Sequence, residues 1–271
     1  MAKSSATKAL GTLPNAPLAY VVVQIRISTF MEMKDHIAAL HAVLRPKLRG
    51  MRESNVQIFQ LSLSEPKVQV VPRWEFYDLS NREGVLVQND SIAFHTTHYE
   101  DGVSFLRRVR IVLDAVEKVL PNMLMTERIG LRYVDIVVPN NTEFPNEYVA
   151  EGLRGIEDHM KPKHSMYFAS YELDQGTMIF RYNILPPGTE PLPEELLPLQ
   201  LDPSPVLQRA RASQRFLGVL DSDRSIHDRS EFNPENLMSQ LNGMHDDISR
   251  MFKAVGSKHA FKIWNEKNSD A

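Results

Sequence analysis

Two arginines flank a glycine in the stretch RIGLRYVDIV, which runs from Arg128 to Val137. On a β-strand, side chains two residues apart point to the same face, so Arg128, Gly130 and Arg132 share one face. The glycine leaves space between two long cationic side chains, and guanidinium groups bind carboxylates and phosphates through paired hydrogen bonds. The sequence therefore predicts either an anion-binding site or a structural network of ion pairs at these arginines.

Arg26 is a third candidate for this cluster, because it stands in a similar strand, YVVVQIRISTF. Two nearby guanidiniums repel each other unless carboxylates or an anionic ligand lie between them. The candidate carboxylates are Glu75, Glu127 and Glu172. Trp74 could stack on a ligand, although core packing is the more common use of a tryptophan. Structural pairing is favoured over a ligand site, since structural ion networks also cluster charged residues.

The remaining sequence motifs give little support for catalysis or metal binding. His95 and His98 form an HxxH, but on an extended segment the two side chains point to different faces, and the spacing matches no zinc motif. His245 and Asp246 are adjacent and do not face each other. We therefore expect solvent-exposed or capping histidines, no metal and no cofactor. The motifs of common hydrolases and nucleotide-binding enzymes are absent, which favours a protein without catalytic residues.

The composition narrows the class of protein further. The chain of 271 residues contains no cysteine, which excludes disulfides, thiolate catalysis and Cys-ligated metal sites. Its 34 acidic and 31 basic residues give a net charge of −3, so no overall positive charge favours nucleic acid or an anionic membrane. The sequence contains no secretory signal and no run of about 20 apolar residues. We expect a cytoplasmic protein that does not enter a membrane.

The hydrophobic pattern predicts an α+β fold. Residues 1–17 are expected to form a flexible tail, and residues 18–271 a single domain of two pseudo-repeats, 20–120 and 126–255. Each repeat is expected to contain a strand, a helix, three strands and a helix, in a mainly antiparallel, saddle-like sheet with the helices on one face. Residues 186–212 contain seven prolines and are expected to cross the surface, with a helical turn near their end.

Several elements have clear sequence signals. Leucine and valine at spacings of 3 and 4 predict a helix around residues 106–120, and the last helix is expected to begin after Asn233 and to end at Gly256. A short helix is expected near residues 146–158. Residues 85–97 are expected to form one strand.

The leading strands of the two pseudo-repeats carry equivalent arginines. Alignment of VQIR with IGLR makes Arg26 equivalent to Arg132. If the two strands meet near a pseudo-two-fold axis, the two arginines lie close together. We expect Arg132 to be mostly buried beside the first leading strand and bound to at least one carboxylate, because an unpaired buried guanidinium costs several kcal/mol.

The segments PLAYVVVQIRI, FHTTHYEDGVSFLRRVRIVLDAVEKVLP and ERIGLRYVDIV resemble a sporadically distributed bacterial family that has no settled biochemical function. The resemblance extends over most of residues 17–264 and implies no catalytic residues. Its patchy distribution is typical of genes exchanged between strains, as defence and toxin–antitoxin genes are. The duplicated plan is also similar to the saddle of TATA-binding-protein-like folds, an analogy of fold alone.

We therefore expect a non-enzymatic binding or regulatory protein. The setting implied by the resemblance is bacterial defence or a toxin–antitoxin system, in which the chain acts as a partner or neutralising component, with a protein partner or as a homo-oligomer. One alternative is a nucleic-acid binder that uses the arginine-bearing sheet face, although the net charge argues against it. The other is an enzyme that acts on a phosphorylated small molecule.

Overall fold

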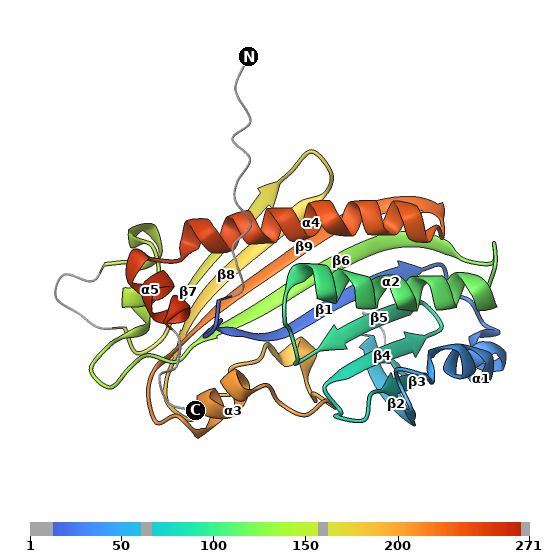
Figure 1. Cartoon of the computed structure of the whole chain (residues 1–271), viewed down its shortest axis with the longest axis horizontal. Coiled ribbons are helices and arrows are strands. Elements are labelled where there is room, and N and C mark those ends of the chain that lie inside the picture. The colour runs from blue at the N-terminus through green and yellow to red at the C-terminus, as the bar shows by residue number, and fades with distance from the viewer. Residues whose placement is uncertain (1–12, 61–66, 157–161, 267–271) are drawn as a thin grey trace, which may run out of the picture.

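A single open antiparallel sheet organises the molecule (Figure 1). The computed structural model describes residues 13–60, 67–156 and 162–266, without the side chains of residues 56–60 and 67–69. Within these ranges the sheet has nine strands in the order β2-β3-β4-β5-β1-β6-β9-β8-β7. The strands are β1 (Leu18–Ile27), β2 (Gly50–Gln60), β3 (Lys67–Tyr77), β4 (Glu83–Gln88), β5 (Ser91–Thr96), β6 (Met125–Val137), β7 (Ser165–Glu172), β8 (Thr177–Leu185) and β9 (Leu217–Glu231). The α+β class and the antiparallel sheet are confirmed.

Helices cover one face of this sheet, which we call the helix face. Helices α1, α2 and α4 lie on it, and their apolar stripes form one core with alternate residues of β1, β5 and β6. The helices and 3-10 turns are α1 (Met33–Leu44), α2 (Gly102–Val119), η1 (Pro145–Tyr148), η2 (Glu151–Leu153), η3 (Glu194–Leu196), α3 (Pro205–Ala212), α4 (Pro234–Val255) and α5 (Lys258–Asn265). None of the described helices has the length and apolar character needed to cross a membrane.

The two leading strands, β1 and β6, are neighbours at the centre of the sheet. They pair antiparallel with Gln24 opposite Gly130, and Arg26 lies opposite Arg128 rather than Arg132. The prediction that Arg26 and Arg132 lie close together is therefore wrong. Arg26 and Arg132 each follow the paired residues Gln24 and Gly130 by two positions. Because the two strands run in opposite directions, the two arginines lie on opposite sides of this pair. The duplication of the sequence stays a prediction.

The structure corrects two predicted elements. The single strand expected at residues 85–97 is the hairpin of β4 and β5, because Asn89 and Asp90 are good turn formers and occupy its two-residue turn. The short helix expected near residues 146–158 consists of two 3-10 turns, η1 and η2. The chain leaves this region through Gly155, whose φ of 73° is a left-handed conformation that ends helices. Residues 157 and 158 lie outside the described residues.

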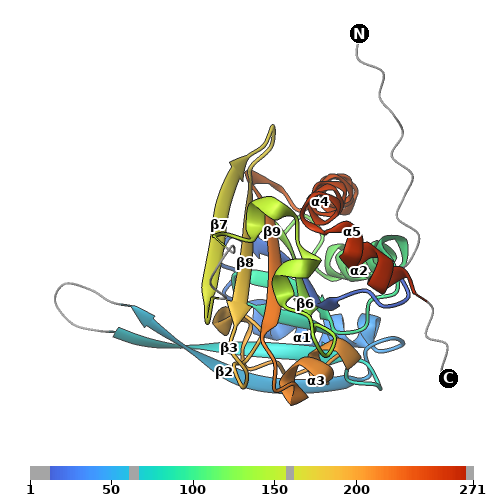
Figure 2. The same ribbon diagram turned by 90° about the vertical axis from the view of Figure 1, so that its left-hand side faces the viewer.

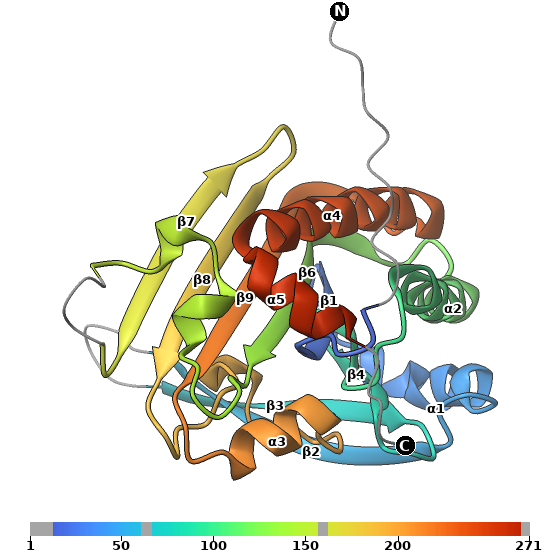
Figure 3. The ribbon, with the colours of Figure 1, turned by 60° about the vertical axis from the view of Figure 1, so that its left-hand side comes forward.

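The C-terminal helices follow their sequence signals. The Asn233 side chain accepts a hydrogen bond from the N–H of Asn236, so it caps α4 as predicted, and α4 ends before Gly256. A further helix, α5, turns away from α4 beyond this glycine (Figure 3). The described part of the tail predicted at residues 1–17 is held in place at two points. The N–H of Asn15 donates to Trp264 O of α5 at 2.9 Å, and Pro17 O accepts from the N–H of Ile136 of β6 at 2.7 Å.

The proline-rich residues 186–212 fold back onto the sheet face opposite the helix face, which we call the polar face. Leu192 and Leu207 are buried there against Val134 and Ile136 of β6. The helical turn expected near the end of this segment is α3. Asp202 anchors the segment, because its carbonyl accepts a hydrogen bond from Thr97 Oγ1 at 2.6 Å. The segment therefore covers part of the polar face and leaves the rest exposed.

Candidate functional site

A cleft of about 390 Å³ lies on the polar face, between the central strands and residues 196–200 of the proline-rich segment. Leu86, Ala93, Gln24 and Gly130 are successive register partners on β4, β5, β1 and β6 and line its floor. The two small residues in this row, Ala93 and Gly130, leave depth between longer side chains. Residues 196–199 add apolar walls, so the cleft combines polar and apolar surface.

Arg132 fixes one side of the cleft by structural pairing. Its Nε and Nη2 donate to the two carboxylate oxygens of Asp221 at 2.7 and 2.8 Å, and Nη2 also donates to Glu195 at 2.8 Å. Arg132 is 9% exposed and Asp221 is 1% exposed. Burial lowers the pKa of the guanidinium, but its hydrogen bonds to Asp221 and Glu195 outweigh that effect and raise it. The prediction of a buried, carboxylate-bound Arg132 is confirmed.

Arg128 lines the same cleft and is paired far less completely. Its Nη1 donates to Gln24 Oε1 at 3.4 Å, and its Nη2 lies 3.7 Å from Asp223 Oδ1, beyond hydrogen-bond distance. The side chain lies over Gly130, since a Cβ atom at that position would come within 2.9 Å of Arg128 Nη1. Burial raises the pKa of Asp223, and the positive charge of Arg128 partly offsets this increase. Arg128 therefore presents donors that an anion in the cleft could use.

A buried chain of hydrogen bonds forms another part of the cleft wall. The Tyr20 hydroxyl lies 3.0 Å from His95 Nδ1, and His95 Nε2 lies 3.1 Å from Glu75 Oε1. All three residues are less than 5% exposed. Because an ionised carboxylate only accepts hydrogen bonds, we assign a proton to Nε2, and in that tautomer Nδ1 accepts from the Tyr20 hydroxyl. The chain fixes the position of the Tyr20 hydroxyl, and burial together with the nearby Glu75 raises the pKa of that hydroxyl.

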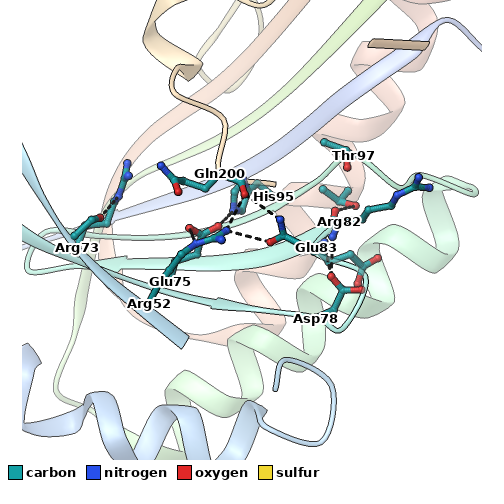
Figure 4. Close-up of polar contacts among 12 residues, drawn as sticks. Arg52, Arg73, Glu75, Asp78, Arg82, Glu83, His95, Thr97 and Gln200 are labelled. Atoms are coloured by element: carbon teal, nitrogen blue, oxygen red, sulfur yellow. Dashed lines mark hydrogen bonds and ion pairs between the residues drawn. The ribbon is translucent and has the colours of Figure 1, made fainter. Parts of the chain in front are cut away.

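Arg52 completes this chain and connects it to the proline-rich segment (Figure 4). Its Nε donates to Glu75 Oε2 at 2.7 Å, and its Nη2 donates to Gln200 O at 3.0 Å. Burial alone would raise the pKa of Glu75, but the hydrogen bonds from His95 and Arg52 lower it to about 2. The carboxylate is therefore ionised at neutral pH. Arg73, also on the cleft wall, donates from Nε to Ser54 Oγ at 3.3 Å among the described residues.

The other predicted site residues lie elsewhere. Arg26 is exposed and pairs with Asp90 at 3.1 Å, outside the cleft lining. Glu127 accepts a hydrogen bond from Ser28 Oγ, and Glu172 is exposed at the end of β7. The described ion pairs of the three arginines are with Asp90, Asp223, Asp221 and Glu195, and not with the candidate carboxylates Glu75, Glu127 and Glu172. Asp221 and Asp223 come from β9, the strand beside β6. Trp74 is buried on the helix face beneath α1, where it cannot stack on a ligand in the cleft.

Sequence reasoning missed several residues of the cleft. His95 is buried rather than exposed or capping, because its two ring nitrogens have partners on β1 and β3. Asp221 and Asp223 were missed as a pair. Their spacing of two residues was a usable signal, since it places both carboxylates on one face of β9. The neighbouring strand could not be identified from this spacing.

One group of side chains away from the cleft could hold a metal ion. Ligand atoms of Glu143, Glu147 and His259 lie within 4.8 Å of one another. Glu143 already accepts hydrogen bonds from the Tyr148 hydroxyl and the N–H of Asn140, and it pairs with His259 at 3.0 Å. Ordinary hydrogen bonds and an ion pair therefore account for this arrangement.

A comparison of the chain with models of protein families, with curated proteins and with solved structures finds no match. The resemblance to a sporadic bacterial family therefore stays a prediction.

Proposed function

We propose that the protein binds a small organic anion in the cleft of the polar face. The observation that carries this proposal is Arg128, a guanidinium that faces the cleft while its closest described carboxylate oxygen is 3.7 Å away. Arg132 provides a contrast, because its Nε and Nη2 donate to Asp221 and Glu195 at 2.7–2.8 Å. A cation with unused donors in a partly enclosed space favours a phosphate or carboxylate ligand.

The size and surface of the cleft indicate what else the ligand contains. A volume of about 390 Å³ lies within the usual range for small-molecule sites. Leu86, Leu196 and Leu199 line it together with Gln24 and Gln88, so an apolar body with polar substituents fits better than a bare ion. Arg73 stands four strands from Arg128, or roughly 19 Å away at the usual strand spacing, and could bind a second anionic group.

Isothermal titration with octyl phosphate, octanoate and inorganic phosphate tests this proposal. We expect octyl phosphate to bind more tightly than inorganic phosphate, because its alkyl chain buries apolar surface against the leucines. Arg128→Gln should weaken binding by about tenfold or more, the loss expected for a charge-assisted hydrogen bond. Arg26→Gln is the matched control, since Arg26 is opposite Arg128 on β1 but does not line the cleft.

Two results would contradict the proposal. One is that none of the three probes binds to the unaltered protein. The other is that Arg128→Gln and Arg26→Gln weaken binding equally, which would indicate attraction to surface charge rather than a site. The proposal is compatible with a regulatory role beside a protein partner in a defence or toxin–antitoxin setting, which stays a prediction.

Catalysis on the same class of ligand is a second candidate function, favoured by the chain of Glu75, His95 and Tyr20. A hydroxyl joined to a carboxylate through an imidazole can act as a general acid or base. Phosphorus NMR of octyl phosphate incubated with the protein tests this reading. Loss of the ester signal in the unaltered protein, but not in Tyr20→Phe, would support it, whereas an unchanged spectrum in both would count against it.

The nucleic-acid alternative receives less support from the polar face. Its arginines are interspersed with acidic groups, namely Glu75, Glu195, Asp221 and Asp223. Phosphate backbones bind to surfaces with a large excess of positive charge. A shift assay at low salt would revive this alternative if it showed binding that weakens steeply as salt is added.

A further inference from the structure

β7 ends the sheet on one side and has an edge without a neighbouring strand in the described part of the chain (Figure 2). At the turn into β8, the N–H of Leu173 donates to Gly176 O at 3.0 Å. Main-chain groups of alternate residues point toward the neighbour in an antiparallel ladder. The main-chain N–H and C=O groups that point to β8 are therefore those of Leu173, Tyr171 and Ala169. The residues whose N–H and C=O groups point outward are Met166, Phe168, Ser170 and Glu172.

The side chains of β7 are unusually apolar for a free edge. Met166 is 65% exposed and Phe168 is 55% exposed on the polar face, while Tyr167 and Tyr171 are partly exposed on the helix face. The guanidinium of Arg181 lies 5.7 Å from the Phe168 ring centroid and supports that ring. Free edges are usually protected by charged residues, proline or bulges, and β7 has none of these between Ser165 and Tyr171.

The opposite edge of the sheet differs in this respect. β2 carries Arg52 and Glu53 in the part whose side chains are described, and Arg52 is bound to Glu75. Charges of this kind discourage pairing with another strand. The two edges are therefore not equivalent, and β7 is the one suited to strand addition.

We propose that a second copy of this chain pairs with β7 across a two-fold axis at Phe168, which joins two sheets into one continuous antiparallel sheet. The axis of such a dimer is perpendicular to the sheet and keeps each face on its own side. Residues with outward main-chain groups then pair with each other. His164 lies opposite Glu172 of the second copy, Met166 opposite Ser170, and Phe168 opposite Phe168.

Polar complementarity and packing favour this register and a second copy as the occupant. The pairing of His164 with Glu172 occurs twice, once at each end of the strand pair, so the edge is complementary to itself. Phe168 and Met166 of both copies form one apolar row on the polar face. An axis at Ala169 would instead place Met166 opposite Glu172, which brings a carboxylate against an apolar side chain.

Sedimentation velocity over a range of concentrations tests the dimer. We expect a species of twice 31.0 kDa that dissociates on dilution. Ser170→Pro removes an outward N–H, and Phe168→Asp places two carboxylates at the axis, so each should raise the dissociation constant at least tenfold. Leu79→Asp is the control, because Leu79 is 88% exposed in the turn between β3 and β4 and should leave the dimer unchanged.

Disulfide cross-linking tests the register without depending on a disruptive substitution. The chain has no cysteine of its own, so Phe168→Cys creates the only thiol. Hydrogen-bonded antiparallel pairs have Cα atoms about 5.5 Å apart, within the range that a disulfide spans. We expect mild oxidation to link the two copies of Phe168→Cys covalently, and Leu79→Cys to dimerise without forming a cross-link.

Three outcomes would overturn the proposal. The first is a monomer at every concentration. The second is a dimer that survives Phe168→Asp and does not cross-link at position 168, which would place the interface elsewhere. The third is a monomer whose β7 edge binds only a different protein strand.

Discussion

The guanidinium of Arg128 lies directly over Gly130, the residue two positions along the same strand. A Cβ atom on Gly130 would come within 2.9 Å of Arg128 Nη1, so the absence of a side chain allows the arginine to lie along the cleft floor. The spacing of arginine, glycine and arginine thus has a steric explanation. Arg132, the other arginine, turns toward Asp221 on β9.

Gly130→Ala should weaken anion binding and leave the fold intact. The new methyl group meets the far end of a flexible side chain, so Arg128 can move away at little cost in stability. The moved guanidinium no longer points along the cleft floor, and we expect octyl phosphate to bind at least about tenfold less tightly. Calorimetry and thermal melting of the same samples measure both effects. Gly152→Ala is a suitable control, because no described atom lies within 4 Å of the added methyl group.

Arg132→Ala should destabilise the protein by roughly 3–5 kcal/mol, the range for breaking a buried ion pair. Removal of Arg132 leaves Asp221, which is 1% exposed, with Arg181 as its remaining cationic partner. Arg26→Ala removes an exposed ion pair and should change the free energy of unfolding by less than about 1 kcal/mol. Urea denaturation measures both values. Equal, small effects of the two substitutions would show that the Asp221 pair does not contribute as argued.

Glu75 should make the protein sensitive to acid. Its pKa is lowered to about 2 in the folded state from an ordinary value of 4.5. At pH values above 4.5 the ionised carboxylate therefore contributes its full stabilisation of the fold. The stabilisation is lost as pH falls from about 4.5 toward about 2, and its full size is on the order of 3 kcal/mol. Glu75→Gln should therefore reduce stability at neutral pH and flatten the pH dependence in this window. Denaturant melts of both proteins between about pH 2 and about pH 7 test the prediction.

Asp135 should act in the opposite direction. It lies in the interior of β6, and burial together with the nearby Asp221 raises its pKa from 3.8 to about 8. The folded state thus keeps a proton that the unfolded chain releases, and stability falls by about 1.4 kcal/mol per pH unit between these values. Asp135→Asn removes this dependence. The free energy of unfolding of Asp135→Asn, relative to that of the unaltered protein, should rise from about pH 4 to about pH 8 and then level off. A difference that stays constant over this range would mean that Asp135 is ionised in the folded state.

Local patterns were enough to predict many of the elements and two of the cleft residues. The alternation of apolar residues in β1 and β6 identified both strands, and the spacing of leucine and valine identified α2. Arg128 and Arg132 were recognised because two cations on one face of an apolar strand require partners. These predictions depend only on residues close together in the sequence.

The partners themselves depend on the order of the strands, which local patterns do not determine. Asp221 pairs with Arg132 across 89 positions of the sequence because β9 lies beside β6. Alternating acidic residues such as Asp221 and Asp223 are uncommon in strands, so this segment has a weak strand signal. β9 continues to Glu231 because arginines on neighbouring strands compensate Asp221 and Asp223. His95 was misjudged for the same reason, because Tyr20 and Glu75 reach it from β1 and β3.

The central position of β1 has a consequence for the order in which the chain folds. β1 is the first strand of the sequence, yet it lies between β5 and β6. Ribosomes add about 5–20 residues per second, so β1 can pair with β5 seconds before β6 has been synthesised. During that time β1 is a temporary edge, open to a chaperone or to another nascent chain. Arg132 arrives with β6, and Glu195 and Asp221 arrive later still, so a chain interrupted before β6 would have a partial sheet but no cleft.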